Sequence, residues 1–202
     1  MAETAASAAA VCPACGKTPG STLACLACGR LLDEPADADH FARLGAPRSP
    51  HVDRDALEAA YIRLSRLLHP DFHGGEGEAA LERANRGSAL LNEAWSVLTD
   101  APSRQEYLLE LLDAGALERH KVLPPAFLVE ALELSEELED AQRGEDPRAA
   151  AALVERVRQA MRERDAVLDE PSVWSAGDTA RLARLLHEQR VYRRILRDAG
   201  VA

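Results

Sequence analysis

Residues 57–75 read LEAAYIRLSRLLHPDFHGG, an amphipathic helix followed by an abrupt stop. The apolar side chains recur every three or four residues and so share one helical face: Leu57, Ala60, Tyr61, Leu64, Leu67 and Leu68. Pro70 ends the helix because proline lacks the amide hydrogen that a helix interior requires. The two glycines of the loop that follows favour mobility, so we expect His69 and Asp71 to be exposed at its base.

Two further helices are predicted on either side of this stretch. Residues 39–45 form a short helix that stops at Gly45 and Pro47, and Asp53 is an N-cap candidate for the helix quoted above. After the loop, a helix carries apolar or small residues at alternating spacings of three and four: Leu81, Ala84, Ser88, Leu91, Trp95 and Leu98. This spacing favours packing of the later helix against its predecessor as a hairpin.

The helix, the His69-Pro70-Asp71 loop and the antiparallel helix are followed by Pro102, Arg104 and Tyr107. This order resembles the J-domain signature. The resemblance implies that His69, Pro70 and Asp71 contact an ATPase chaperone and stimulate its hydrolysis, with Arg63 and Arg66 as electrostatic support on a solvent-facing side. Most J-domains have lysine after the aspartate, whereas Phe72 stands here, as in metal-containing mitochondrial relatives of HscB.

Simpler interpretations of these residues stay open. The tripeptide can be an ordinary surface turn, and the two arginines can be a solvated helix face. A catalytic His–Asp pair is disfavoured, because no serine or cysteine nucleophile signature accompanies it.

All four cysteines lie in two CxxCG units, Cys12-Pro-Ala-Cys15-Gly and Cys25-Leu-Ala-Cys28-Gly. A gap of two residues lets both thiolates of a pair face one metal, and the glycine after each pair permits a tight turn. The units therefore predict a structural zinc site of four cysteines, closed to catalysis. Iron in the same site is the main alternative. Two disulfides or a redox CxxC are disfavoured without a secretion signal.

The C-terminal part is expected to be a helical bundle. A helix over 126–143 has a core face at 100° per residue, formed by Phe127, Ala131, Leu134, Leu138 and Ala141. Its flank and opposite side carry Leu128, Val129, Leu132, Glu133 and Glu136. Burial of the first stripe leaves the second exposed, and an exposed apolar patch rimmed by carboxylates indicates a partner-binding surface.

Two more helices complete the predicted bundle. One is capped by Asp146-Pro147 and turns Leu153, Val157, Ala160 and Leu168 inward. The last starts near Asp178, stops at Gly200 and uses Leu182, Leu185, Gln189, Tyr192 and Leu196. Three helices of this length with short links predict an antiparallel three-helix bundle.

Residues 127–138, FLVEALELSEEL, closely resemble the client-binding helix of HscB, and residues 106–109 and 178–181 also match that family. In HscB the corresponding surface binds the IscU-type iron–sulfur scaffold protein. The resemblance implies client contacts at Leu128, Val129, Leu132, Glu133, Glu136 and Leu185. Relatives often have an aromatic residue at the position of Leu185, which also falls on the apolar stripe of its own helix. Burial in the bundle core is the alternative for each leucine.

The expected fold is mainly α, with a small Cys₄ zinc knuckle, a J-domain helical hairpin and a C-terminal three-helix bundle. We predict a disordered tail over 1–10, the knuckle over 11–34, the J-domain over 37–112, a connector over 113–125 and the client-binding domain over 126–202. No apolar run approaches the ~18 residues that span a bilayer. Residues 1–10 lack the basic start of a signal peptide, which favours a cytoplasmic protein.

The predicted function is a non-enzymatic co-chaperone that delivers an IscU-type scaffold to a DnaK/HscA-type chaperone, stimulates its ATPase and assists iron–sulfur cluster assembly. The net charge of −10 argues against nucleic acid as the main partner, because phosphate binding depends on Lys and Arg. A J-domain adaptor for a different client, or a nucleic-acid-associated zinc-knuckle protein, are the alternatives. An enzyme is the weakest alternative, because no nucleophile–base set and no open metal site are evident.

Overall fold

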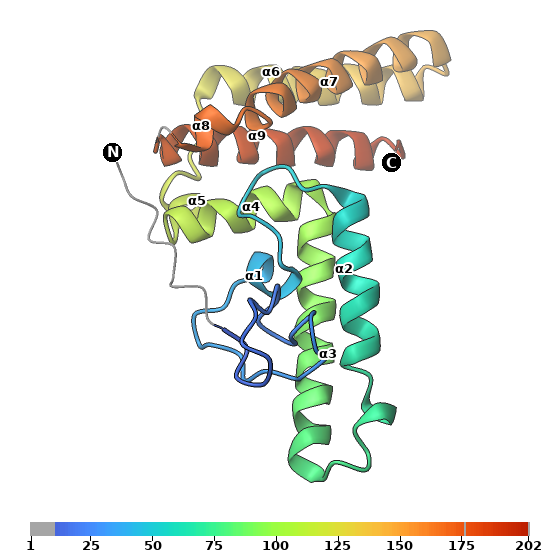
Figure 1. Ribbon diagram of the computed structural model, residues 1–202. Coiled ribbons are helices and arrows are strands. Elements are labelled where there is room, and N and C mark those ends of the chain that lie inside the picture. Colours follow the sequence, from blue (N-terminus) through green and yellow to red (C-terminus); the bar gives the residue numbers. More distant parts are fainter. Residues whose placement is uncertain (1–10, 176, 202) are drawn as a thin grey trace. The chain divides into compact units, whose positions relative to one another are not determined.

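The computed structural model describes residues 11–175 and 177–201, and the chain divides into two compact units, 1–101 and 102–202. Both units are built from helices (Figure 1). Among the described residues, extended pairing is limited to one isolated antiparallel bridge between Ala24 and Leu31. The prediction of a mainly α fold is confirmed. The predicted tail over 1–10 lies outside the described residues.

Within its described residues, the first unit contains three α-helices and one short 3₁₀ turn: α1 (His40–Leu44), α2 (Arg54–Leu67), η1 (Pro70–Phe72) and α3 (Glu78–Thr99). Asp39 and Asp53 cap α1 and α2, since their side chains accept hydrogen bonds from the amides of Ala42 and Ala56. Such a cap satisfies an amide that has no partner within the helix. The starts of both helices are therefore set by local chemistry, as the sequence predicts for Asp53.

Helices α2 and α3 pack as the predicted hairpin. Leu57, Leu64 and Leu68 are buried on the α2 side, and Ala84, Leu91 and Leu98 are buried on the α3 side. Tyr61 and Trp95, which lie on the two predicted faces, stack with ring centroids 4.5 Å apart. Aromatic contacts of this kind add stability beyond the area that they bury.

The cysteine-containing segment is part of this unit. The Ser21 hydroxyl donates to the carbonyl of Arg43 at 2.7 Å, and the Thr22 amide donates to the carbonyl of Ala42 at 3.2 Å. Gly45 ends α1 with a φ of 67°, and a Cβ atom at this position would lie 2.1 Å from the carbonyl oxygen of Gly20. The lack of a side chain at Gly45 therefore lets the backbone of the cysteine-containing segment at Gly20 pack directly against the end of α1.

The second unit contains six helices among the described residues: α4 (Ala101–Leu112), α5 (Ala116–Arg119), α6 (Pro125–Arg143), α7 (Pro147–Leu168), α8 (Pro171–Ser175) and α9 (Thr179–Asp198). The three long helices of the predicted bundle are α6, α7 and α9. Two short helices were not predicted: α5 lies in the expected connector, and α8 precedes α9. No helix of the described part combines the length and the apolar character needed to cross a membrane.

The core of the second unit forms where α6, α7 and α9 meet. Its buried members are Leu123, Phe127, Ala131, Leu134, Leu138, Val154, Val157, Tyr192 and Ile195. Phe127 and Tyr192 meet edge to face, with centroids 5.4 Å apart and an interplanar angle of 85°. The predicted core stripe of the first bundle helix is buried, apart from Ala141, which is half-buried.

An ion pair links α7 to α9 inside the bundle. Nε of Arg164 lies 2.7 Å from Oε2 of Glu188, and both side chains are largely buried. The Arg164 guanidinium also lies 4.8 Å from the ring centroid of Tyr192 and 5.7 Å from that of Phe127. This stacking on aromatic faces suits the planar, weakly hydrated guanidinium group.

Candidate metal centre and partner-binding surfaces

The four cysteine sulfurs converge. The Sγ atoms of Cys12, Cys15, Cys25 and Cys28 all lie within 4.8 Å of one another. The Cys12–Cys28 and Cys15–Cys25 pairs are each separated by 3.7 Å, well beyond the ~2.05 Å of a disulfide. Tetrahedral zinc with bonds of ~2.3 Å places its sulfurs about 3.8 Å apart, so the cluster fits one such ion.

A tight backbone turn closes each CxxC pair. Gly16 and Gly29 follow the two CxxC pairs with φ values of 69° and 79°, as a tight turn requires. Their amides donate to the carbonyls of Cys12 and Cys25 at 2.8 Å. These turns close each CxxC pair around the centre of the cluster.

The pKa values of Cys12 and Cys28 are shifted in opposite directions. The amide of Ala14, together with that of Cys15 and the thiols of Cys28 and Cys25, lowers the pKa of Cys12 to about 6, against the effect of burial. The amide of Arg30 favours the Cys28 thiolate, but burial and the other three cysteines raise the pKa of Cys28 to about 12. Four thiolates this close require a cation, which a metal ion would provide.

The His69-Pro70-Asp71 tripeptide forms an exposed turn. Nδ1 of His69 accepts a hydrogen bond from the Asp71 amide at 3.3 Å, so the proton of the neutral ring resides on Nε2. The Asp71 carboxylate lies 3.6 Å from the same Nδ1. Phe72 is 69% exposed and packs edge-on against His69, with centroids 5.9 Å apart. An imidazole, a carboxylate and an aromatic ring are thus presented together.

His73, which was not predicted to be a site residue, fixes the base of this turn. Its ring is buried, and Nε2 donates to the carbonyl of Leu67 at 2.8 Å. Leu67 is the last residue of α2, where carbonyls lack partners within the helix. A histidine shortly after a predicted helix end could have indicated such a cap.

The two arginines of α2 differ in their surroundings. The guanidinium of Arg63 donates to the carbonyl of Leu26, which lies between the second pair of cysteines. Arg66 is exposed and forms no ion pair within the described ranges. Arg63 is also exposed, as predicted, and it additionally contacts the cysteine segment, which was not predicted.

The outward side of α6 is apolar and acidic. Leu128, Val129 and Leu132 are 48%, 55% and 58% exposed. Glu133 and Glu136 are exposed on the same helix, while Leu185 of α9 is half-buried. The predicted division of this helix into a buried and an exposed stripe is confirmed. The client-binding role of these six residues remains a prediction.

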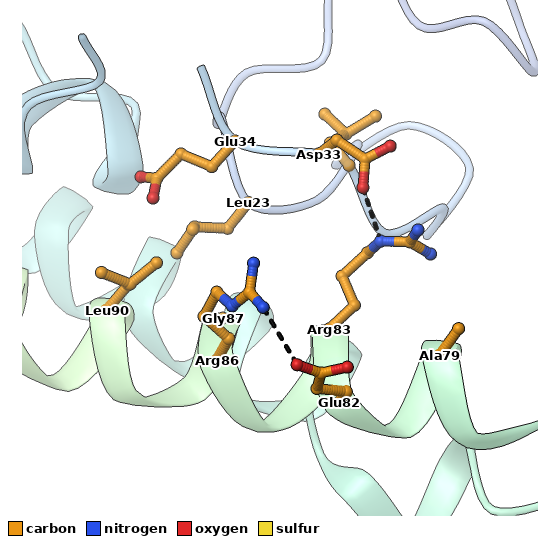
Figure 2. Close-up of a pocket in the computed structure, with 10 residues that line it drawn as sticks. Leu23, Asp33, Glu34, Ala79, Glu82, Arg83, Arg86, Gly87 and Leu90 are labelled. Carbon is orange, nitrogen blue, oxygen red and sulfur yellow. Dashed lines mark hydrogen bonds and ion pairs between the residues drawn. The ribbon is translucent and has the colours of Figure 1, made fainter. Parts of the chain in front are cut away.

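A hollow of about 320 Å³ lies between residues 23–34 and α3 (Figure 2). Arg83 pairs with Asp33 at 2.7 Å, and Arg86 pairs with Glu82 at 3.1 Å, as the dashed lines in Figure 2 show. Because these rim charges are engaged with one another, the hollow does not present a set of groups that converges on a ligand.

Comparisons with known proteins agree with this architecture. Residues 123–199 match the family model described as the HSCB C-terminal oligomerisation domain. The solved structure of human co-chaperone protein HscB is 25% identical, with a TM-score of 0.73 over 95% of this chain and 98% of that chain. The chaperone HscB from Vibrio cholerae is 26% identical, with a TM-score of 0.66 over 81% of this chain and 96% of that chain.

The fold and the C-terminal domain resemble those of helical co-chaperones. Within that class, the chain is similar to HscB in its C-terminal domain and in its matches to the two solved structures. The resemblance stated from the sequence is thereby confirmed, together with a cysteine cluster that can hold a metal.

Proposed function

We propose that the protein is a co-chaperone that presents an IscU-type iron–sulfur scaffold protein to a DnaK/HscA-type chaperone and stimulates its ATPase activity. The observation that carries this proposal is the exposed apolar stripe of α6, Leu128, Val129 and Leu132, within a domain of the HscB type. A stable bundle has no need to expose three large apolar side chains on one helix, whereas a client-binding surface does.

Each unit has a separate task in this proposal. In the first unit, His69, Pro70 and Asp71 contact the ATPase chaperone, with Arg66 and Arg63 as nearby positive charges. In the second unit, Leu128, Val129, Leu132 and Leu185 bury apolar area against the client. Glu133 and Glu136 attract basic side chains at the rim of that contact. The protein itself catalyses no reaction and acts in the cytoplasm.

The metal in the cysteine cluster is proposed to be zinc with a structural role. Zinc has no redox chemistry and accepts four thiolates in tetrahedral geometry. With four protein ligands it has no open position for substrate. The ion would hold the two CxxC turns together, and Cys12, Cys15, Cys25 and Cys28 would be its ligands.

A reconstituted ATPase assay tests this function. Phosphate release by a purified DnaK/HscA-type chaperone is measured alone, with this protein, and with this protein plus an IscU-type scaffold. We expect stimulation by the protein and further stimulation when the scaffold is added. Unchanged phosphate release in both mixtures would contradict the proposal, and stimulation without any binding of the scaffold would indicate a different client.

A further inference from the structure

A second hollow lies wholly within the second unit, where the segment before α6 meets the start of α9. Its volume is about 350 Å³, and its lining is Arg119, His120, Val122, Leu123, Pro124, Pro125, Ala180 and Arg184. Every ionisable side chain in this lining is basic, although the chain as a whole carries a net charge of −10. The hollow therefore places two guanidinium groups, one of them paired with Asp113, on an acidic protein.

One of its cations is held in place. The guanidinium of Arg119 pairs with the Asp113 carboxylate and donates to the carbonyl of Ala114 at 2.6 Å. The Thr179 hydroxyl donates to the other oxygen of Asp113 at 2.7 Å. The Thr179 hydroxyl and Arg119 hold the pKa of Asp113 below its ordinary value. These contacts fix the position of the guanidinium before any ligand arrives.

The other arginine is available. Arg184 is exposed and forms no ion pair or hydrogen bond through its side chain within the described part of the chain. A guanidinium has five N–H donors in a planar fork, which matches the two oxygens of a carboxylate. Arg184 is thus the group in this hollow with the most unused hydrogen-bonding capacity.

The remaining lining is apolar and stiff. Val122 is 85% exposed, and Pro124 and Pro125 are exposed beside it. Pro124 has φ −58° and ψ 136°, the extended polyproline conformation. A rigid apolar ridge loses little conformational entropy when an extended chain packs along it. The ridge and the cations together match a segment that alternates carboxylates with apolar side chains.

We propose that this hollow, the Arg184 pocket, binds an extended acidic and apolar segment of a partner protein, with a carboxylate of that segment on Arg184. The exposed face of α6 carries carboxylates and would bind basic side chains of a partner. The Arg184 pocket would bind acidic ones, so it is a second site with the opposite charge preference. At physiological salt, charges beyond ~8 Å are largely screened, so the net negative charge of the chain does not cancel the attraction of a carboxylate to Arg184. This inference does not depend on stimulation of an ATPase.

A labelled peptide tests the proposal on the full chain. The probe is a fluorescent hexapeptide with the order Ala-Leu-Glu-Glu-Leu-Ala, blocked at both ends, and its match has both Glu replaced by Gln. Binding is followed by anisotropy at about 0.15 M salt. The pocket variants are Arg184→Gln and Arg184→Glu. Arg158 of α7 is also exposed and without an ion pair in the described ranges, so Arg158→Glu is the matched control.

We expect saturable binding of the Glu peptide, at least about tenfold weaker binding of the Gln peptide, and a similar loss for Arg184→Glu. Arg158→Glu should bind like the unchanged protein. Equal loss in both charge-reversal variants would overturn the proposal, since the attraction would then be general. Displacement of the peptide by an equal concentration of inorganic phosphate would also overturn it, because the pocket would then be a small-anion site. Absence of any binding of the Glu peptide would likewise overturn the proposal.

Discussion

Arg63 of α2 donates a hydrogen bond to the backbone carbonyl of Leu26, within the second pair of cysteines. The helix that leads to the His69 turn is thereby joined to the segment that holds the metal ligands. In the proposed function the same helix supplies positive charge beside the tripeptide that contacts the ATPase chaperone. One side chain therefore connects the candidate metal centre with the proposed chaperone-binding surface.

Substitution of the two arginines of α2 should separate these roles. Arg66→Ala should weaken stimulation of the chaperone ATPase several-fold, because an exposed charge that steers association is lost. Arg63→Ala should destabilise the cysteine segment by ~1 kcal/mol, the usual net contribution of one hydrogen bond to the free energy of folding. Phosphate release and the kinetics of metal loss to a chelator measure the two effects. Faster metal loss from Arg66→Ala than from Arg63→Ala would contradict this division.

Removal of the metal should unfold residues 12–28 and leave most of the helical structure intact. Metal analysis should give about one zinc ion per chain, which is what a single Cys₄ site holds. Circular dichroism should change little after chelation, while the cysteines become reactive to a thiol reagent. Protein purified under reducing, chelator-free conditions with four free thiols and no metal would refute the site. Absorption in the visible range would favour iron.

His69→Gln should abolish stimulation of the chaperone ATPase. The side chain is exposed and belongs to neither apolar face of the hairpin, so the fold and binding of the scaffold should be unchanged. Circular dichroism, scaffold titration and phosphate release measure these three properties on one protein. His73→Gln is an informative comparison, because it removes the buried ring that anchors the same turn. Normal stimulation by His69→Gln would end the J-domain assignment.

Leu132→Ala and Leu138→Ala should have opposite consequences. Leu132 is exposed, so its truncation should weaken scaffold binding by ~1–3 kcal/mol and cost little stability. Leu138 is buried, so its truncation should destabilise the bundle by ~2–5 kcal/mol through the cavity it leaves. Titration calorimetry and thermal melts measure both quantities. Equal destabilisation by the two variants would mean that the outer stripe is part of the core.

Arg164→Met should destabilise the bundle more than substitution of an exposed arginine. It leaves Glu188 as an unpaired, largely buried carboxylate, at a cost of ~3–5 kcal/mol. The double substitution Arg164→Met with Glu188→Leu should recover much of this loss, because no buried charge is left unpaired. Urea unfolding gives the free energy of unfolding of the unchanged protein, of Arg164→Met and of the double variant. Arg158→Met serves as the exposed control. A double variant as unstable as Arg164→Met alone would contradict this explanation.

Local patterns in the sequence were sufficient for the long helices and the cysteine cluster. Asp53 as a cap, the buried faces of α2 and α3, and the two stripes of α6 all follow from spacing along one helix. The convergence of four cysteines follows from the two CxxC pairs, whose spacing suits a single metal ion. These features depend on short sequence separations, where periodicity carries most of the information.

Contacts between distant residues could not be predicted in the same way. Arg63 and Leu26 are 37 residues apart, and Arg164 and Glu188 are 24 apart. An arginine on a polar helix face looks the same in the sequence whether it faces solvent or a backbone carbonyl. The helices α5 and α8 were missed because four or five residues are too few for a helical pattern to emerge.

The contact between Gly45 and Gly20 determines how freely the cysteine segment can be exchanged between relatives. The two backbones approach so closely that any side chain at position 45 would collide with the carbonyl of residue 20. In a chimera, a cysteine segment taken from a relative must therefore follow the same backbone path at residue 20, next to the end of α1. The cysteine segment and α1 therefore have to be exchanged together. A transplanted segment with a different backbone path at residue 20 would displace the end of α1.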